Sequence, residues 1–311
     1  METRRAGRLG RSIPVIGFGG RALGPPPPRG DRDGPRLEPR DAQRALAAAI
    51  EAGVELVDVA PAWGDAEALA GETIRALRGR DRVVLATLVP DAPPPPGAAP
   101  RPPRPGPDGS TPAPALERVL PAAWVQRAVE ASLRATRLEV LPLAWLPWRG
   151  GWLTASAWPE LRGAMARLVR EGKVLTWGAH LPDVPPDDVA ALLDAAPVAA
   201  IQVALDLEHR AAAAVLDATA TREVAVIVRR PLAGGALTGD VGDLGGVPRA
   251  RWRDEVADRA DLALRWVLGH AAVTAALVGA RTLDHVRAAI AAGDGRALSP
   301  PLREALDAGD T

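Results

Sequence analysis

Three consecutive stretches decide the fold: VLPLAW at residues 140–145, PELRGAMARLVRE at 159–171 and TWGA at 176–179. The first and the last are short and apolar, which is typical of strands buried on both faces, and the middle one repeats apolar residues at helical spacing. Its first residue, Pro159, is tolerated in the first turn of a helix. Strand, helix and strand in this order predict a βα unit on a parallel sheet.

The same alternation runs through the whole chain. We expect strands at Val15–Gly19, Leu56–Val59, Val83–Thr87, Val140–Trp145, Thr176–Ala179, Ala200–Val203, Val224–Val228 and Ala275–Val278. We expect helices at Asp41–Ala52, Ala66–Leu77, Ala122–Leu133, Pro159–Glu171, Pro186–Ala195, Arg210–Thr221, Asp254–Leu268 and Leu283–Ala292, with a short last one at Pro301–Ala308. Eight strands and eight helices predict a single α/β domain over residues 1–311, a (β/α)8 or TIM barrel. The alternative is an open doubly wound sheet, but no Gly-x-Gly-x-x-Gly opens a helix after the first strand.

Composition excludes several classes of function. The 311 residues carry 38 Lys and Arg against 38 Asp and Glu, so no net charge draws the chain to nucleic acid or to an anionic membrane. Because there is no Cys, thiolate chemistry and Cys-based metal sites are impossible, and the four scattered His residues predict no metal site. Without a signal peptide or a long apolar run, we expect a cytoplasmic protein with no membrane partner.

Two residue types are scarce in a way that limits the chemistry. There is no Tyr, and the one Lys in the sequence is Lys173. Lys173 lies in a predicted turn between a helix and the fifth strand, at the end of the barrel that contributes to stability rather than to catalysis. We therefore expect Lys173 to be a surface charge.

A proline-rich segment at residues 90–114 follows the third strand and has no helical or strand periodicity. We expect this insertion to be extended or disordered, and to leave the barrel at the end where such folds build their sites. A shorter run, Pro25–Pro28, follows the first strand on the same face. Either the insertion is a lid or a partner-binding segment, or it is a tolerated low-complexity insertion.

Several blocks of the sequence, in order along the chain, resemble the aldo-keto reductase family of NADPH-dependent barrels. They include RLGRSIPVIGFGGRALG at 8–24, GVELVDVAPAWGDAEALAG at 53–71, DRVVLATLV at 81–89, SLRATRLEV at 132–140, EGKVLTWGA at 171–179, RRPLAGGALTG at 229–239, and LALRWVLGH with VGARTLDHV within 262–286. The first block is similar to the family's amino-terminal β-hairpin and first strand. The resemblance implies a barrel built to reduce carbonyl groups.

The same resemblance implies a catalytic tetrad of Asp, Tyr, Lys and His, which is degenerate here. Asp58 matches the aspartate, whereas the tyrosine position holds Trp63, the lysine position Leu88 and the histidine position Pro147. An indole N–H donates a hydrogen bond but does not release a proton near neutrality. Three of the four inherited roles are therefore lost.

The cofactor residues that the resemblance implies are mixed. They are Gln202, Arg229, Pro231, Leu232, Gly234, Gly235, Leu237, Gly279 and Arg281. The glycine-rich loop at 231–239 is similar to the family's pyrophosphate-binding segment, where backbone amides approach the anion. Against this, the family's nicotinamide-binding Ser-Asn is His180-Leu181, and its adenine-binding Glu-Asn is Ala288-Ala289. NADP(H) binding is therefore expected to be weakened or lost, and a plain structural turn remains the alternative for the loop.

Asp58 and His180 form the sharpest candidate acid–base pair. Without the lysine, burial raises the pKa of such a carboxyl group, unless Arg21, Arg229 or Arg230 neutralises it. The tryptophans at 63, 145, 148 and 152 fall at or after strand ends, where they either line an apolar pocket or pack in the core. If they line a pocket, the ligand is an apolar or aromatic small molecule.

Three hypotheses follow. The first is a pseudoenzyme, or a barrel repurposed for non-redox binding, that has lost efficient carbonyl reduction. The second is an active NAD(P)H-dependent oxidoreductase with an unorthodox proton donor such as Asp58, His180 or water. The third is a cyclase or isomerase that uses Asp58 and His180.

Overall fold

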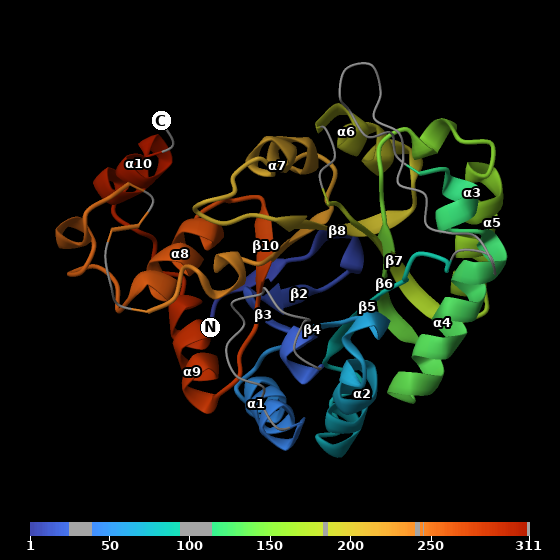
Figure 1. The fold of residues 1–311 in the computed structure, drawn as a ribbon, viewed down its shortest axis with the longest axis horizontal. Helices are drawn as coiled ribbons and strands as arrows, with labels where there is room; N and C mark the ends of the chain where they lie inside the picture. Colours follow the sequence, from blue (N-terminus) through green and yellow to red (C-terminus); the bar gives the residue numbers. More distant parts are fainter. Residues whose placement is uncertain (25–38, 94–113, 183–185, 240–242, 245, 310–311) are drawn as a thin grey trace.

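The expected strands close into a barrel in the computed structural model, which describes residues 1–24, 39–93, 114–182, 186–239, 243–244 and 246–309 (Figure 1). All the barrel pairings are parallel, in the order β10–β3–β4–β5–β6–β7–β8–β9. The strands are β3 (Ile16–Gly19), β4 (Leu56–Val59), β5 (Val84–Leu88), β6 (Leu141–Pro147), β7 (Val174–His180), β8 (Val198–Ala204), β9 (Ala225–Arg229) and β10 (Val273–Val278). The predicted (β/α)8 barrel is confirmed.

Helices surround the barrel, as Figure 1 shows. They are α1 (Pro39–Glu51), α2 (Ala66–Ala76), α3 (Leu116–Val119), α4 (Ala122–Thr136), α5 (Trp158–Arg170), α6 (Pro186–Ala195), α7 (Ala213–Thr219), α8 (Arg259–Leu268), α9 (Leu283–Ala292) and α10 (Pro300–Ala308). Short 3-10 turns lie at η1 (Gly7–Leu9), η2 (Gly20–Leu23), η3 (Pro61–Trp63), η4 (Trp152–Thr154), η5 (Ala233–Gly235) and η6 (Arg249–Arg251). No described helix is both long and apolar enough to cross a membrane.

Two helices begin later than predicted, for local reasons. Helix α7 begins at Ala213 because the preceding Arg210 belongs to a turn, in which its Nε donates to the carbonyl oxygen of Leu207 at 2.9 Å. Helix α8 begins after Asp258, whose carboxylate accepts a hydrogen bond from the backbone N–H of Asp261 at 2.8 Å. An aspartate in extended conformation with this contact is an N-cap, so the helix starts at the next residue.

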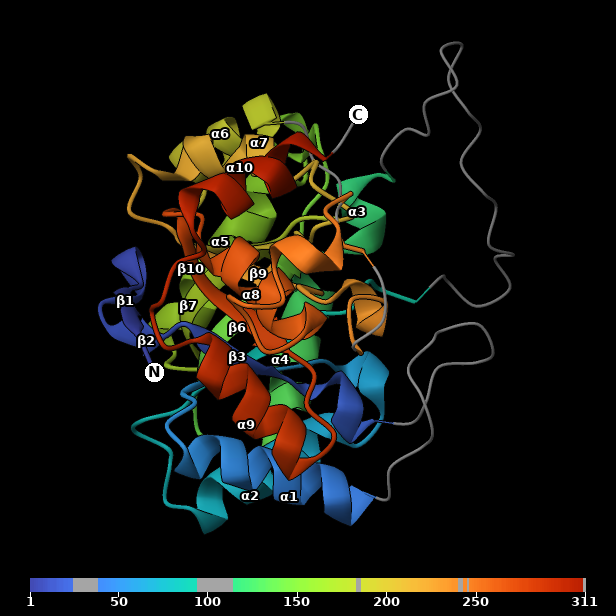
Figure 2. The same ribbon diagram turned by 90° about the vertical axis from the view of Figure 1, so that its left-hand side faces the viewer.

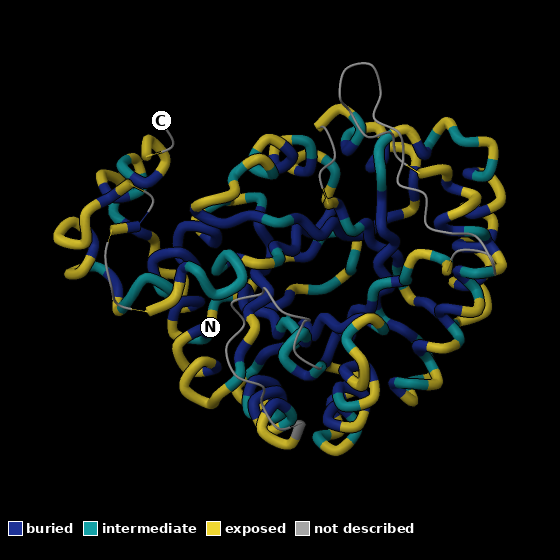
Figure 3. Tube along the Cα trace, in the orientation of Figure 1, coloured by how far each residue is buried: buried dark blue, intermediate teal, exposed yellow. Residues whose placement is uncertain are grey.

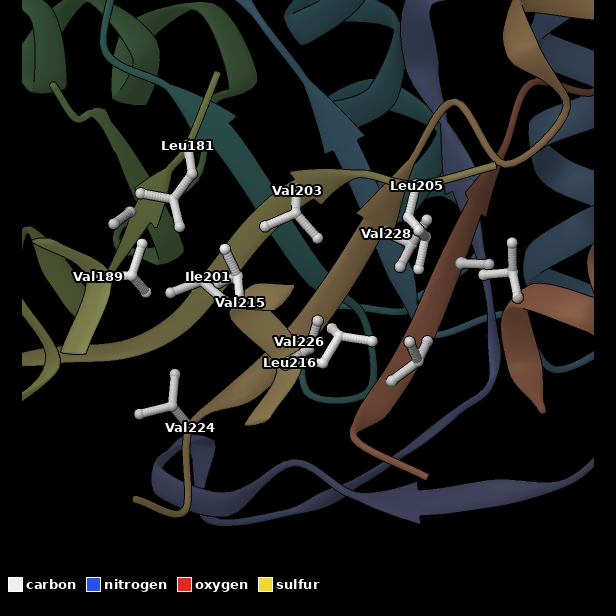
Figure 4. Packing of buried hydrophobic residues seen from close by; sticks show 14 of the residues in the cluster. Leu181, Val189, Ile201, Val203, Leu205, Val215, Leu216, Val224, Val226 and Val228 are labelled. Atoms are coloured by element: carbon white, nitrogen blue, oxygen red, sulfur yellow. The ribbon is translucent and has the colours of Figure 1, made fainter. Parts of the chain in front are cut away.

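The strands bury both of their faces, which explains their nearly continuous apolar sequences. Alternate residues such as Leu56, Leu143 and Ile227 fill the inside of the barrel, and the residues between them pack against the helices. Burial is accordingly deepest along the strands and lowest on the outer helix faces (Figure 3). Figure 4 shows part of the outer layer, where Val226 of β9 lies beside Leu216 of α7.

An amino-terminal hairpin closes one end of the barrel. Strand β1 (Thr3–Arg5) pairs with β2 (Ser12–Pro14) in antiparallel register, as the sequence resemblance implied. Arg4 donates to the carbonyl oxygens of Leu268, the last residue of α8, and Val273, the first residue of β10, at 2.8 and 2.7 Å. The hairpin therefore covers the amino-terminal ends of the strands and lies at one edge of the molecule in Figure 2. The opposite end, where the strands finish, we call the barrel mouth.

Two tryptophans hold the described ends of the proline-rich insertion. Trp124 of α4 donates its indole N–H to the carbonyl oxygen of Pro90 at 2.8 Å, and Trp152 of η4 donates to that of Pro114 at 2.9 Å. Arg149 adds an ion pair with Asp91 at 2.8 Å. Residues 94–113 of the insertion and the run at 25–28 lie outside the described residues, so the expectation that the insertion is extended or disordered stays a prediction.

Candidate functional site

The structure brings the sequence-predicted site residues to the barrel mouth. They are placed as follows: Asp58 in β4, Trp63 in η3, Leu88 at the end of β5, Pro147 at the end of β6, His180 at the end of β7, Gln202 in β8 and Arg229 at the end of β9. The register pairs Pro147 with His180, and His180 with Gln202. Parallel strands thus collect side chains from distant parts of the sequence at one end of the barrel.

A hydrogen-bonded chain links Asp58 to His180 through Gln202. The Oδ1 atom of Asp58 accepts a hydrogen bond from Trp145 Nε1 at 2.8 Å and another from Gln202 Nε2 at 3.0 Å. The Oε1 atom of Gln202 lies 2.6 Å from His180 Nδ1. Since Gln202 stands between the carboxyl group and the imidazole, the candidate pair is connected by an amide bridge.

Burial shifts both titrating groups toward their neutral forms. It raises the pKa of Asp58 to about 7, although the hydrogen bonds from Trp145 and Gln202 and the charge of Arg229 oppose the rise. It lowers the pKa of His180 to about 4, with Gln202 opposing the fall and Arg229 and Arg149 adding to it. The direction for Asp58 is the one expected from the loss of the lysine, because the cost of burying the carboxylate exceeds what the remaining hydrogen bonds and the charge of Arg229 return.

Trp145 is the residue that occupies the space around Asp58. It is fully buried inside the barrel, in register with Leu88 on one side and Gly178 on the other. A Cβ built on Gly178 would overlap the ring carbons Cε3 and Cζ3 of Trp145, so the strand beside the indole has to carry glycine. The indole N–H of Trp145, which pairs with Leu88 across the strands, therefore donates a hydrogen bond to the carboxyl group of Asp58. Leu88, at the position where the resemblance implies a lysine, is apolar.

We predict that Gly178→Ala destabilises the protein by about 1–3 kcal/mol, because the added methyl group displaces the Trp145 ring in a packed interior. The measurement is the free energy of unfolding in urea. Gly163→Ala is the matched control, because Gly163 is an exposed residue of α5 where an added Cβ would meet no atom of the described residues outside its own helix turn within 4 Å. Equal stability of the two variants would contradict the packing described here.

The glycine-rich loop keeps an open backbone. Ala233, Gly234, Gly235 and Gly239 have positive φ angles of 47°, 66°, 97° and 84°. The carbonyl oxygen of Leu232 closes the turn, accepting hydrogen bonds from the backbone N–H groups of Gly235 and Leu237 at 2.8 and 3.2 Å. Among the described residues, an added Cβ at Gly235 or Gly239 would meet no atom within 4 Å, whereas one at Gly234 would lie 3.1 Å from Nη2 of Arg230.

The remaining implied cofactor residues divide into two groups. Gly279 is exposed and Arg281 is half-buried after β10, so both are within reach of a ligand. Gln202 is only 3% exposed, and both ends of its amide are engaged by Asp58 and His180. Gln202 keeps a second amide N–H and a second oxygen lone pair, but with only 3% of its surface exposed it offers little of either to a nicotinamide ring in this arrangement.

The interpretation that tryptophans after the fourth strand line a pocket is wrong for Trp148 and Trp152. Both are 3% exposed and belong to the main hydrophobic core. Trp148 packs edge-to-face against Trp152 and Trp158, at 5.9 and 5.3 Å between ring centroids. Trp63 is the half-buried exception, packed against the core near α2. The preference for an apolar or aromatic ligand stays a prediction.

Charged groups act on both Asp58 and His180. The charge of Arg229 acts on Asp58, and the charges of Arg229, Arg149 and Asp91 act on His180. Over the described ranges, the His, Asp and Glu side chains include no group of three or more that could hold a metal ion. Sequence alone could not identify Trp145 as a hydrogen-bond donor to Asp58, because a tryptophan in an apolar strand is expected to lie in the core. The one available signal was Gly178 in the neighbouring strand.

Comparison with known proteins identifies the family. The model of the aldo/keto reductase family matches residues 15–307. Aldo-keto reductase AKR11C1 from Bacillus halodurans, in its holo form, superposes with a TM-score of 0.72 at 21% identity, over 99% of this chain and 96% of that one. An aldo/keto reductase from Klebsiella pneumoniae, solved with NADP and acetate, gives 0.69 at 26% identity, over 98% and 94%. No curated protein matches. The chain belongs to the aldo/keto reductase family.

Proposed function

We propose that this member of the family has lost efficient NADPH-dependent carbonyl reduction and that its barrel mouth binds a small molecule without reducing it. One observation carries the proposal. The carboxyl group of Asp58, which would polarise a tyrosine through a lysine, is instead hydrogen-bonded to Trp145 and Gln202. Trp63 stands where the resemblance places the tyrosine that donates the proton. Leu88 stands where it places the lysine that lowers the pKa of that tyrosine.

The size of the loss follows from the chemistry of proton transfer. A positioned general acid contributes about 10²–10⁴-fold to a rate. Groups that act as a unit fail together, so losing two of them costs little more than losing one. The indole of Trp63 can donate a hydrogen bond but cannot transfer its proton near neutral pH. Hydride transfer to a carbonyl carbon would therefore have no matching proton transfer to the carbonyl oxygen.

The residues present fit the phosphate end of NADP(H). The open glycine-rich loop with Arg281 would hold the phosphates, and a bound NADPH would supply a hydride. At the other end, the engaged amide of Gln202 and the substitution to His180-Leu181 remove contacts to the nicotinamide. These observations support cofactor binding that is weaker than in relatives with an intact set.

The test is a titration with NADPH followed by quenching of tryptophan fluorescence, and then an assay with reactive aldehydes. We expect weak binding, and no aldehyde-dependent oxidation of NADPH above the rate without enzyme. Weak binding without turnover, or no binding at all, supports the proposal. Turnover at rates ordinary for aldo-keto reductases would overturn it.

A second candidate, an active oxidoreductase with Asp58 as the acid, is favoured by one observation. A carboxyl group with a pKa near 7 is half protonated at neutral pH and is suited to general acid catalysis. Its low exposure of 6%, and the two donors already on Oδ1, count against direct contact with a substrate. If this candidate is right, Asp58→Asn abolishes the turnover that the aldehyde assay detects.

A further inference from the structure

A carboxylate and an imidazole meet in the loop that follows β8. Asp206 comes after the end of that strand at Ala204, and its side chain is only 2% exposed. His209 follows three residues later and has 68% of its side chain exposed. The Nδ1 atom of the ring lies 3.0 Å from Oδ1 and 3.2 Å from Oδ2 of Asp206. A buried carboxylate therefore holds one edge of a ring that is otherwise largely exposed.

The loop does not need the imidazole to close its turn. The Oδ1 atom of Asp206 accepts hydrogen bonds from the backbone N–H groups of Glu208 and His209 at 2.8 and 2.9 Å. The backbone N–H of Asp206 donates to the carbonyl oxygen of His209 at 3.2 Å. Leu205 and Leu207, on either side of Asp206, are buried and anchor the loop. Because these contacts already fix the backbone, the contact with the ring serves to orient the side chain of His209.

The carboxylate selects the tautomer of the ring. An ionised carboxylate only accepts hydrogen bonds, so we assign the proton of the neutral imidazole of His209 to Nδ1, where it is donated to Asp206. The lone pair then lies on Nε2, to which no group in the described parts of the chain is hydrogen-bonded. A carboxylate on the far side of the ring raises the basicity of that nitrogen. A nitrogen that is basic, oriented and unengaged is suited to act as a nucleophile.

The chain offers this nitrogen few competitors. It has no Cys and no Tyr, and its one Lys, Lys173, is paired with two glutamates at 2.9 Å each. Among the other histidines, His180 and His270 are half-buried. His285 is exposed, but its ring has no carboxylate partner among the described residues. His209 is thus the exposed histidine whose ring a carboxylate orients.

We propose that His209 is a nucleophile for activated carboxylic esters, with Asp206 as its positioning residue. Nε2 adds to the ester carbonyl carbon, and the bond to the aryl oxygen breaks as an aryloxide leaves with the electron pair. The acyl group is then on Nε2, while the Nδ1 proton stays hydrogen-bonded to Asp206. Water adds to the acyl carbon and the C–N bond breaks, which releases a carboxylic acid and restores the neutral ring.

The reaction balances without a cofactor. The proton that water gives up neutralises the aryloxide, so ester and water become acid and phenol. An aryloxide leaves without a proton donor, which is why an ester of a phenol, rather than of an aliphatic alcohol, matches a single oriented imidazole. This activity goes beyond the proposed function, because it needs neither NADPH nor Asp58.

The test is the hydrolysis of 4-nitrophenyl acetate by the full chain without cofactor, followed as the release of 4-nitrophenolate. His209→Gln should lower the protein-dependent rate about tenfold or more. His285→Gln is the matched control, because it removes an exposed histidine whose ring no described carboxylate orients, and it should keep most of the rate. An undiminished rate in His209→Gln, or equal losses in the two variants, would overturn the proposal.

Asp206→Asn tests the positioning role. The amide oxygen can accept both backbone hydrogen bonds of the turn, whereas the amide N–H donates to Nδ1 of His209 and so places the ring proton on Nε2. We expect the rate to fall about tenfold or more and the nitrogen chemical shifts of the ring to change from those of the Nδ1–H to those of the Nε2–H tautomer. Full activity, or a loss of activity and stability with an unchanged tautomer, would overturn the proposal. Because the assay contains no NADPH or aldehyde, its failure leaves the proposed loss of carbonyl reduction standing.

Discussion

The double variant Trp63→Tyr with Leu88→Lys is expected to oxidise NADPH in the presence of a reactive aldehyde about a hundredfold or more faster than the wild type. The two changes restore a phenol that can release a proton and a cation beside Asp58 that lowers the phenol's pKa. Both positions lie at the barrel mouth, after β4 and at the end of β5, and both are only partly buried. The measurement is the initial rate of the loss of NADPH absorbance under saturating aldehyde.

The variant Trp63→Phe with Leu88→Met is the matched control, since it makes similar changes of size without proton chemistry. A rise in the tyrosine–lysine variant alone supports the loss of the proton donor as the cause of inactivity. An equal gain in the two variants would show that pocket shape limits the reaction. No gain in either would mean that Trp145, which already hydrogen-bonds Asp58 at 2.8 Å, keeps the carboxyl group out of the restored set.

The second large effect concerns stability. The free energy of unfolding of Asp58→Asn, taken relative to that of the wild type, is expected to rise by up to about 4 kcal/mol between pH 4 and pH 8. In the folded wild type the pKa of Asp58 is about 7, against an ordinary value of 3.8, so across this window the unfolded chain gives up a proton that the folded chain retains. Deprotonation therefore favours unfolding as the pH rises from 4 to 7. Asparagine cannot ionise and removes this loss.

The measurement is the free energy of unfolding in urea at several pH values between 4 and 8, taken as the difference between variant and wild type. The difference is needed because burial lowers the pKa values of His180 and His270 to about 4, so both histidines make the folded state more stable as the pH rises from 4 to 6.5. These contributions are common to both proteins and cancel. A difference that does not change with pH would show that Asp58 titrates normally.

The fold was predictable because one signal repeats along the chain. Strands buried on both faces, such as β6 and β8, are short apolar runs, and the helices between them are amphipathic over ten residues or more. The predicted helix boundaries were wrong at helix starts such as Ala213, because the turn at Arg210 continues the apolar pattern without helical geometry. Periodicity indicates which residues face the core, but local hydrogen bonds decide where a helix begins.

The site was predictable only in part. Asp58, His180 and Gln202 could each be placed at a strand end, but the contact of Gln202 with both of its neighbours depends on the stagger of β4, β7 and β8. The role of Trp145 depends on the absence of a side chain at Gly178, one strand away. Such contacts join residues far apart in sequence, and no local pattern encodes them.

The two indole N–H groups that hydrogen-bond the carbonyl oxygens of Pro90 and Pro114 affect how this protein can evolve. With both attachment points fixed on α4 and η4, the intervening stretch can be lengthened, shortened or exchanged without moving the strands that carry the site. The rim beside β5 is therefore a natural graft point, where new recognition sequences can be added while the barrel beneath them stays the same.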